Sequence, residues 1–436
     1  MSTVALRADF LHCLRDPGLD GADTQAVEVM RDGLLLMHAG RIERLAPAAV
    51  MLPTLGPAVE IVDRRGLLAV PGFVDTHVHF PQVDVIASYG SQLLDWLERY
   101  TFPEERRFAD AAHAQTAASF FLDRLLENGT TTASVFCTVH PGSVDAFFTA
   151  SQARGLLMVA GKCLMDRHAP DGLRDDTLGG IEESRQLIER WHGQGRSRYS
   201  ITVRFAVTST PAQLAAAGQL AAAHPSVHVQ SHVAENRDEV AWVARLFPER
   251  RSYLDVYDHY GLLRERAVYA HCIWLDDTDR ARMAASGTAA SFCPTSNLFI
   301  GSGLYDLPQA IAAGHRIGLG TDVGGGTSYS MLRTLAEAYK VQQLQGHSMH
   351  PAYALYLATL GGARSLYLDD RIGQFTPGRD ADLVLLDPTA TPLLARRTGL
   401  REDALDTFFA LMTLGDDRAI RETWAAGRRV HARSPG

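Results

Sequence analysis

The sequence predicts an α/β protein built on a (β/α)8 TIM barrel, with a small composite β-sandwich domain formed by both termini. Three observations support this prediction. Short apolar segments recur eight times in the middle of the chain, and most are followed by a polar loop and a helical pattern. The two ends of the chain show short strand-like runs and turn signals instead. The 436 residues are enough for a large core and more than one structural unit.

The eight apolar segments are the expected barrel strands. They cover residues 67–74, 131–136, 156–161, 201–207, 227–230, 267–270, 288–292 and 316–319. Helical patterns lie between them, for example over residues 111–127, 180–191, 212–223 and 278–285. Because strands alternate with helices, the sheet is expected to be parallel, and eight such units fit a closed barrel. A doubly wound open sheet usually carries a Gly-rich nucleotide-binding turn after its first strand, and the sequence has none there.

The two ends of the chain are expected to pair into one small domain. Strand-like runs at 33–38, 41–45 and 59–62 are accompanied by turn signals at 32–33 and 39–40. The stretches 372–387 and 425–430 have the same character. We therefore expect residues 1–68 and 369–436 to form the β domain and residues 69–368 to form the barrel.

The composition is typical of an ordinary globular enzyme, with 46% hydrophobic and 21% charged residues. The net charge of −8 and the scattered Lys and Arg residues give no basic surface for nucleic acid. No apolar run approaches the length of about 18 residues that predicts a membrane span, and we expect no export signal. The five cysteines have irregular spacing and no C-x-x-C pair, which indicates reduced thiols in a cytoplasmic protein.

Two histidines that end the first barrel strand are the strongest indication of chemistry. His77 and His79 are two residues apart, so on a strand they point to the same side and can share one metal ion. The active residues of a barrel lie at the C-terminal ends of its strands. His232, His271 and Asp322 follow the fifth, sixth and eighth expected strands. Imidazoles with one carboxylate suit Zn²⁺ or Fe²⁺ with a position left for water.

A metal-activated water needs a base, and the leaving group needs an acid. Asp322 can bind the metal and accept the proton of the water. Glu235 lies three residues past His232, near enough to reach a substrate. His271 can either ligate the metal or hydrogen-bond the attacking water, and the sequence leaves both roles open.

The residues after the third and fourth strands bear on the number of metal ions. Barrel hydrolases with two metals commonly bridge them through a carbamylated lysine after strand four, but Arg204 and Phe205 occupy that position here. Arginine stays protonated and cannot bridge, so one metal is expected. Lys162, after strand three, is interpreted as a charge-paired lysine. Arg204 is suited to a carbonyl or anion, and Gln82 to the edge of a purine or pyrimidine.

These residues resemble the amidohydrolase superfamily and, within it, the guanine deaminases. The His-x-His pair and the Thr-Asp pair at 321–322 mark the superfamily. The Phe-Pro-Gln run at 80–82, the Tyr-Thr-Phe-Pro run at 100–103 and the spacing from His232 to Glu235 resemble guanine deaminases in particular. The run at 100–103 also predicts a helix start, with Thr101 and Glu104 at capping-box spacing. Cys272 and Trp274 depart from the family pattern.

The resemblance implies an enzyme of purine catabolism that hydrolyses the 2-amino group of guanine to give xanthine and ammonia through a metal-activated water. It also implies one Zn²⁺ per chain, a small-molecule purine substrate and a homodimer. The implied metal ligands are His77, His79, His232 and Asp322; the catalytic residues are Glu235, His271 and Asp322; and the substrate-binding residues are Gln82, Arg204, Phe205 and Glu235.

Three other functions remain open on the sequence. A deaminase of another aminated heterocycle, such as 8-oxoguanine or a pterin, would share every catalytic residue and differ only in the pocket. A ring-opening amidohydrolase would use the same barrel, although Arg204 argues against its two-metal members. A scaffold protein without activity would be expected to have lost site residues, and none is missing here.

Overall fold

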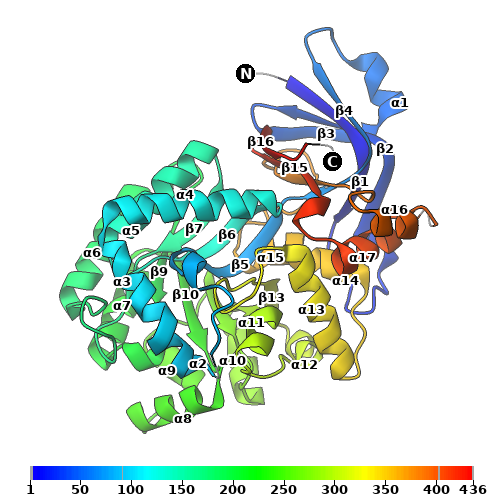
Figure 1. Ribbon diagram of the computed structural model, residues 1–436. Coiled ribbons are helices and arrows are strands. Elements are labelled where there is room, and N and C mark those ends of the chain that lie inside the picture. Colours follow the sequence, from blue (N-terminus) through cyan, green and yellow to red (C-terminus); the bar gives the residue numbers. More distant parts are fainter. Residues whose placement is uncertain (1–2, 91, 401–402, 435–436) are drawn as a thin grey trace.

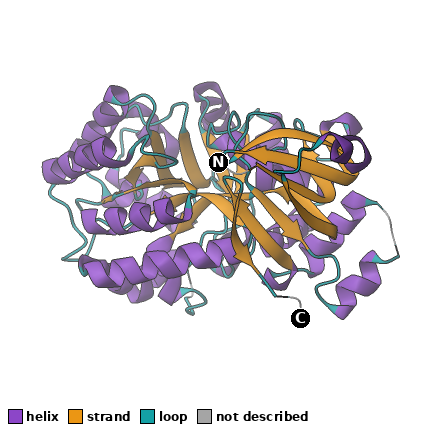
Figure 2. Cartoon of the chain, turned by 90° about the horizontal axis from the view of Figure 1, so that it is seen from above, coloured by secondary structure: helices purple, strands orange, loops and turns teal. Residues whose placement is uncertain are grey.

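The computed structural model of the chain describes residues 3–90, 92–400 and 403–434. It contains two sheets, a parallel barrel and a smaller mixed sheet, which lie beside each other (Figure 1). Figure 2 shows the two groups of strands side by side, with helices along the outer side of the barrel. Within the described ranges, no helix has the length and apolar character needed to cross a membrane.

The barrel strands follow one another around the sheet in chain order, and every pair is parallel. They are β5 (Phe73–His79), β6 (Thr130–Phe136), β7 (Leu157–Gly161), β9 (Arg198–Val203), β10 (His228–Val233), β11 (Ala267–His271), β12 (Ala289–Phe292) and β13 (Arg316–Leu319), with the short β8 (Cys163–Leu164) paired to β9. Beyond β13, the Asp322 N–H donates to the His77 carbonyl and the His79 N–H donates to the Val323 carbonyl, both at 2.9 Å. These bonds close the barrel rim, and the predicted barrel is confirmed.

Helices cover the barrel strands in the predicted alternation. The helix expected over 111–127 is confirmed as α4 (Ala111–Glu127), and the three other expected helices appear as α6 (Thr177–Trp191), α7 (Pro211–Ala223) and α10 (Asp277–Ser286). The remaining barrel helices are α5 (Pro141–Arg154), α8 (Arg237–Leu246), α9 (Tyr253–His259), α11 (Pro294–Phe299), α12 (Leu307–Ala312), α13 (Met331–Leu344), α14 (Pro351–Tyr356) and α15 (Gly362–Ser365). Side-chain oxygens cap several helix starts, as Asp110 does by accepting from the Ala112 N–H.

The two termini together build the smaller sheet. Its order is β16 (Arg428–Ala432), β15 (Ile420–Ala425), β14 (Leu383–Leu386), β4 (Glu60–Pro71), β1 (Thr3–Cys13), β2 (Val27–His38) and β3 (Arg41–Pro47). The composite domain is confirmed, but its strands form one continuous sheet where a sandwich would have two. One face of this sheet encloses its own apolar core, which includes Leu6, Phe10, Leu385 and Trp424. Helices α16 (Pro392–Thr398) and α17 (Ala404–Leu414) lie at its barrel side (Figure 1).

Three local predictions at the domain junction and the N-terminus were wrong. The segment 67–74 is divided between two sheets, because β4 ends at Pro71 and β5 begins at Phe73. The backbone turns at Gly72, where the Thr131 side chain occupies the space that a Cβ would need. His77 and His79 lie at the C-terminal end of β5, where the sequence predicted them. Strand β1 was not predicted, and residues 32–33, expected as a turn, lie inside β2 beside a shift in the β1–β2 register.

The insertion after β5 also differs from the prediction. It contains a 3₁₀ segment (Phe80–Val85) and then one helix made of α2 (Leu93–Trp96), a π-helical turn (Leu97–Thr101) and α3 (Phe102–Arg106). The expected capping box at Thr101 is wrong, because the helix begins after Gln92, whose side chain accepts from the Leu94 N–H at 3.1 Å. The wider π turn accommodates Pro103, which has no N–H for the regular ladder.

Candidate active site

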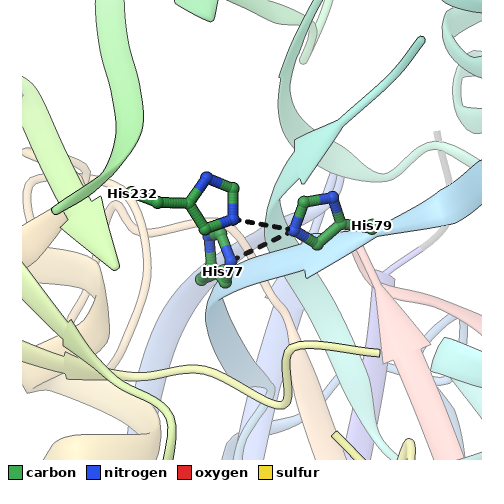
Figure 3. Close-up of side chains that lie close together, drawn as sticks. All are labelled: His77, His79 and His232. Atoms are coloured by element: carbon green, nitrogen blue, oxygen red, sulfur yellow. Dashed lines mark hydrogen bonds between the residues drawn. The ribbon is translucent and has the colours of Figure 1, made fainter. Parts of the chain in front are cut away.

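Three imidazoles meet at the C-terminal end of the barrel (Figure 3). His77 and His79 lie on β5, and His232 lies on β10. The Nε2 atom of His79 is 3.2 Å from the Nε2 atoms of both His77 and His232. Asp322, on the loop after β13, places Oδ1 at 3.1 Å from His77 Nε2 and at 3.4 Å from His79 Nε2. The predicted metal ligands therefore converge on one point.

The spacing and chemistry of these atoms fit a metal ion. Metal–nitrogen bonds of about 2.0–2.1 Å put the ligands of a tetrahedral site roughly 3.3 Å apart. His232 Nδ1 lies 2.6 Å from the Arg204 carbonyl, so Nδ1 carries the proton and Nε2 presents a lone pair. Burial and the neighbouring His77 hold the pKa of both His79 and His232 well below the usual value, which favours the neutral form that binds metals.

Asp322 is held ionised although it is buried. Burial alone would raise its pKa, but the neighbouring His77 and His271 imidazoles hold the pKa of this carboxyl far below its usual range. An ionised carboxylate is the form that ligates a metal or accepts a proton. The three imidazoles and this carboxylate could together hold a metal ion. Two groups of potential metal ligands occur within the described ranges, and both include His77: one adds His79 and His232, and the other adds His271 and Asp322.

The backbone is strained around this cluster. Ala234, His271, Cys272 and Asp322 have φ values of +50°, +72°, +53° and +51°, in the left-handed region that non-glycine residues rarely adopt. Hydrogen bonds hold these positions, for example from the Cys272 N–H to the Val233 carbonyl at 3.1 Å. The strain occurs at the strand ends that carry the functional side chains, as is usual for active sites.

Glu235 and His271 lie together beside the metal-binding cluster. His271 Nε2 is 3.3 Å from Glu235 Oε2 and 3.8 Å from Asp322 Oδ2. Glu235 Oε1 accepts from the Ser302 hydroxyl at 3.0 Å. Burial, and then the charge of Asp322, raise the pKa of Glu235, so its carboxyl can hold and release a proton near neutral pH.

The tautomer of His271 follows from Asn297. His271 Nδ1 lies 2.9 Å from Asn297 Oδ1 and donates to it, which leaves Nε2 with a lone pair. This Nε2 atom is buried and has no hydrogen-bond partner in the described part of the chain. It is an acceptor suited to a water molecule or a metal ion, so both roles foreseen for His271 remain compatible with the geometry. Asn297 had no distinguishing sequence signal.

A second buried cluster joins Arg204, Glu105 and Gln82. Arg204 Nη1 donates to Glu105 Oε2 at 2.5 Å, and Gln82 Nε2 donates to Glu105 Oε1 at 3.1 Å. The Gly324 N–H donates to Gln82 Oε1 at 3.1 Å. Sequence reasoning missed Glu105, because nothing local distinguishes it from the adjacent Glu104 in a helix whose packing was unknown.

One cavity connects the two clusters. Its walls combine the polar site residues with an apolar side that the insertion after β5 supplies. The lining residues are His79, Gln82, Leu93, Trp96, Leu97, Arg204, Phe205, His232, Glu235, Glu239, His271, Ile300, Asp322 and Gly325. All the residues expected to bind substrate are among them. A cavity that combines an apolar wall with convergent polar groups is typical of a small-molecule site.

The two departures from the family pattern lie outside this cavity lining. Cys272 is buried, and its thiol donates to the Tyr269 carbonyl. The Trp274 indole N–H donates to the Ser302 carbonyl at 3.1 Å, so Trp274 supports the residue that contacts Glu235. Lys162 is charge-paired as expected, with Nζ at 2.6 Å from Asp175 and 3.4 Å from Glu183.

Comparisons with known proteins agree with this arrangement. The amidohydrolase family model matches residues 68–430. A guanine deaminase from Escherichia coli (strain K12) is 47% identical over 430 residues, which cover 99% of this chain and 98% of that protein. The solved E. coli guanine deaminase structure superposes with a TM-score of 0.97 over 99% of this chain and 100% of that one. The guanine deaminase from Bradyrhizobium japonicum is 34% identical, with a TM-score of 0.96 and complete coverage of both chains. The chain belongs to the amidohydrolase family.

Proposed function

We propose that this protein is a guanine deaminase, which hydrolyses the 2-amino group of guanine to give xanthine and ammonia with one Zn²⁺ per chain. The observation that carries the proposal is the single cavity in which a metal-binding cluster and a protonatable Glu235 face the Arg204–Gln82 pair. The E. coli relative, 47% identical over 99% of this chain, is a guanine deaminase, which supports the same substrate.

The proposed zinc ligands are His77, His79, His232 and Asp322, since their ligand atoms converge. A bound zinc ion would lower the pKa of a water molecule and so supply a nucleophile at neutral pH. Asp322 and His271 both offer acceptor atoms at this point and would take up the proton that the water loses.

Glu235 is the proposed proton carrier. When the water oxygen bonds to C2 of guanine, the protonated Glu235 carboxyl gives its proton to the adjacent ring nitrogen. The proton that Asp322 or His271 took from the water passes to Glu235, which gives it to the amino group. The C2–N bond then breaks as the hydroxyl on C2 gives its remaining proton to the Glu235 carboxylate, so the amine leaves as ammonia and C2 becomes an oxo carbon. The buried position of Glu235, next to the hydroxyl of Ser302, keeps solvent from competing for this proton.

The rest of the purine would be held by the second cluster and the apolar wall. Arg204 and Gln82 are suited to the oxygen and nitrogen acceptors of the ring edge, with Arg204 near the 6-oxo group. Phe205, which lines the cavity directly after Arg204, offers an apolar surface for the ring.

Ammonia release by the zinc-loaded protein tests the proposal. The panel is guanine, 8-oxoguanine, adenine, cytosine and a pterin, at equal concentrations. Selective turnover of guanine would support both the reaction and the substrate. Turnover of another ring would retain the mechanism and overturn the substrate, and release from none of them with zinc bound would overturn the reaction.

We also infer that the protein is a homodimer in the cytoplasm. The exposed apolar residues Leu298, Phe299 and Leu414 line one surface groove, which supports contact with a second copy. The five cysteines are free thiols, which suits a reducing compartment. Sedimentation equilibrium would give twice the chain mass for the dimer, and a single chain mass would contradict it.

A further inference from the structure

Glu105 holds both members of the proposed substrate-recognition pair at once. Its two carboxylate oxygens accept separately from Arg204 Nη1 and from Gln82 Nε2. All three side chains are buried, with exposed fractions of 1% for Glu105 and 2% for the other two. Because both donors bind one carboxylate, the guanidinium and the amide lie beside each other.

This contact determines which end of the Gln82 amide faces Glu105. An ionised carboxylate only accepts hydrogen bonds, so the NH₂ end of the amide must face it. The Gly324 N–H only donates, so the oxygen end must face Gly324. The approach of the two backbones requires glycine, since a Cβ at residue 324 would lie 2.6 Å from the backbone carbonyl oxygen of Gln82. The amide therefore cannot rotate to exchange its nitrogen and oxygen.

Arg204 adds donors of the same polarity. A guanidinium carries N–H groups only and stays protonated. Apart from the bond to Glu105, its N–H groups have no hydrogen-bond partner within residues 3–90, 92–400 and 403–434. The negative charge of Glu105 also compensates the buried positive charge of Arg204.

A row of donors selects a row of acceptors. The oxo group and N7 of guanine are two adjacent acceptors, whereas a 6-amino purine presents a donor where guanine has its oxygen. We infer that Glu105 is a positioning residue that orients Gln82 and Arg204 as donors and thereby selects 6-oxo over 6-amino purines. This inference rests on the proposed function.

The exchange Glu105→Gln tests it. A glutamine at 105 has its own donor end, which faces either the Gln82 NH₂ group or the Arg204 guanidinium, so the donor arrangement is no longer imposed. With the zinc-loaded full chain, we expect kcat/KM for guanine to fall by about 100-fold and that for 2,6-diaminopurine by less than about 10-fold. The guanine-to-diaminopurine ratio therefore falls by at least about tenfold, while the zinc content stays unchanged.

The adjacent Glu104→Gln exchange is the matched control. Glu104 lies in the same helix, is nearly as buried, and pairs with Arg107 at 2.7 Å and His113 at 3.2 Å, away from the cavity lining. We expect this exchange to leave the substrate ratio within about threefold of the starting protein. An equal change of the ratio in the control would overturn the inference, because any lost carboxylate would then have the same effect.

Two further outcomes separate the possible failures. If Glu105→Gln lowers kcat/KM for guanine and for 2,6-diaminopurine by the same factor, Glu105 is only a countercharge and the inference is wrong. If Glu105→Gln does not fold, Gln82→Met removes one donor directly; an unchanged substrate ratio in that variant overturns the inference, and a tenfold lower ratio supports it. Failure of the unmodified protein to act on guanine would instead refute the proposed function.

Discussion

The exchange Glu235→Gln isolates the proposed proton carrier. Glutamine has the shape of glutamate, and its amide oxygen can still accept from the Ser302 hydroxyl, which is 3.0 Å from Oε1 in the structure. Its nitrogen can occupy the place of Oε2, which lies 3.3 Å from His271 Nε2. The exchange therefore keeps the packing and removes only the ability to carry a proton.

The size of the effect follows from that loss. Positioned general acids and bases contribute typically about 10²–10⁴-fold to the rate. Glu235 is proposed to act in both protonation steps, so we expect kcat for guanine to fall at least about 100-fold. This fall corresponds to roughly 2.7 kcal/mol in the activation free energy. KM should change by less than about threefold, because the ring edge is held by other residues.

Steady-state ammonia release measures kcat and KM, and atomic absorption measures zinc. Asp238→Asn is the control, since Asp238 is an exposed acidic residue at the start of α8. Zinc content should stay near one ion per chain in both variants. Activity of Glu235→Gln within about threefold of the starting protein would remove Glu235 from the mechanism. A loss of zinc would show that its effect passes through the metal site.

Three other results are expected. Removal of zinc by a chelator should abolish ammonia release, and added zinc should restore it. The unfolding free energy should fall by about 4 kcal/mol relative to the protein with zinc at 1,000 times its Kd. Full activity after verified metal removal would contradict the metal site. Lys162→Met leaves the largely buried Asp175 carboxylate without its partner and should lower the unfolding free energy in urea by about 3–5 kcal/mol; a loss below about 1 kcal/mol would contradict this reasoning. Burial lowers the pKa of His228 from 6.5 to about 3, so the unfolded chain binds a proton there that the folded chain excludes, and stability falls as the pH drops from 6.5 towards 3. When the pH is lowered from 7 to 5, the unfolding free energy of the starting protein should fall by about 2 kcal/mol more than that of His228→Gln. Equal falls in the two proteins would refute the low pKa of His228.

Local sequence patterns were sufficient to predict the barrel. Each strand places consecutive apolar residues into a sheet that helices cover, so the pattern is visible within a few residues of any point in the chain. The C-terminal ends of these strands meet at one rim, so His77, His79, His232, His271 and Asp322 could be assigned to one site before any distance was known. The convergence of His77, His79, His232 and Asp322 in the structure agrees with that expectation.

The errors occurred where the choice of partner depends on distant residues. Residues 67–74 read as one apolar strand, but β4 pairs with β1 and β14 whereas β5 pairs with β6. Apolar character does not specify which sheet a strand joins. The helix from Leu93 to Arg106 likewise passes through a local capping signal at Thr101, because packing over the cavity outweighs a cap worth about 1 kcal/mol.

The sequence therefore specified the fold class, the candidate metal ligands and the family, because each depends on residue type and on spacing along the chain. The role of Glu105 required the folded chain. It lies 99 residues from Arg204 and 23 from Gln82, and only the docking of the insertion over the barrel places its carboxylate between them. Polar networks of this kind depend on distances of a few ångströms between separate elements, and no local pattern in a single sequence encodes such distances.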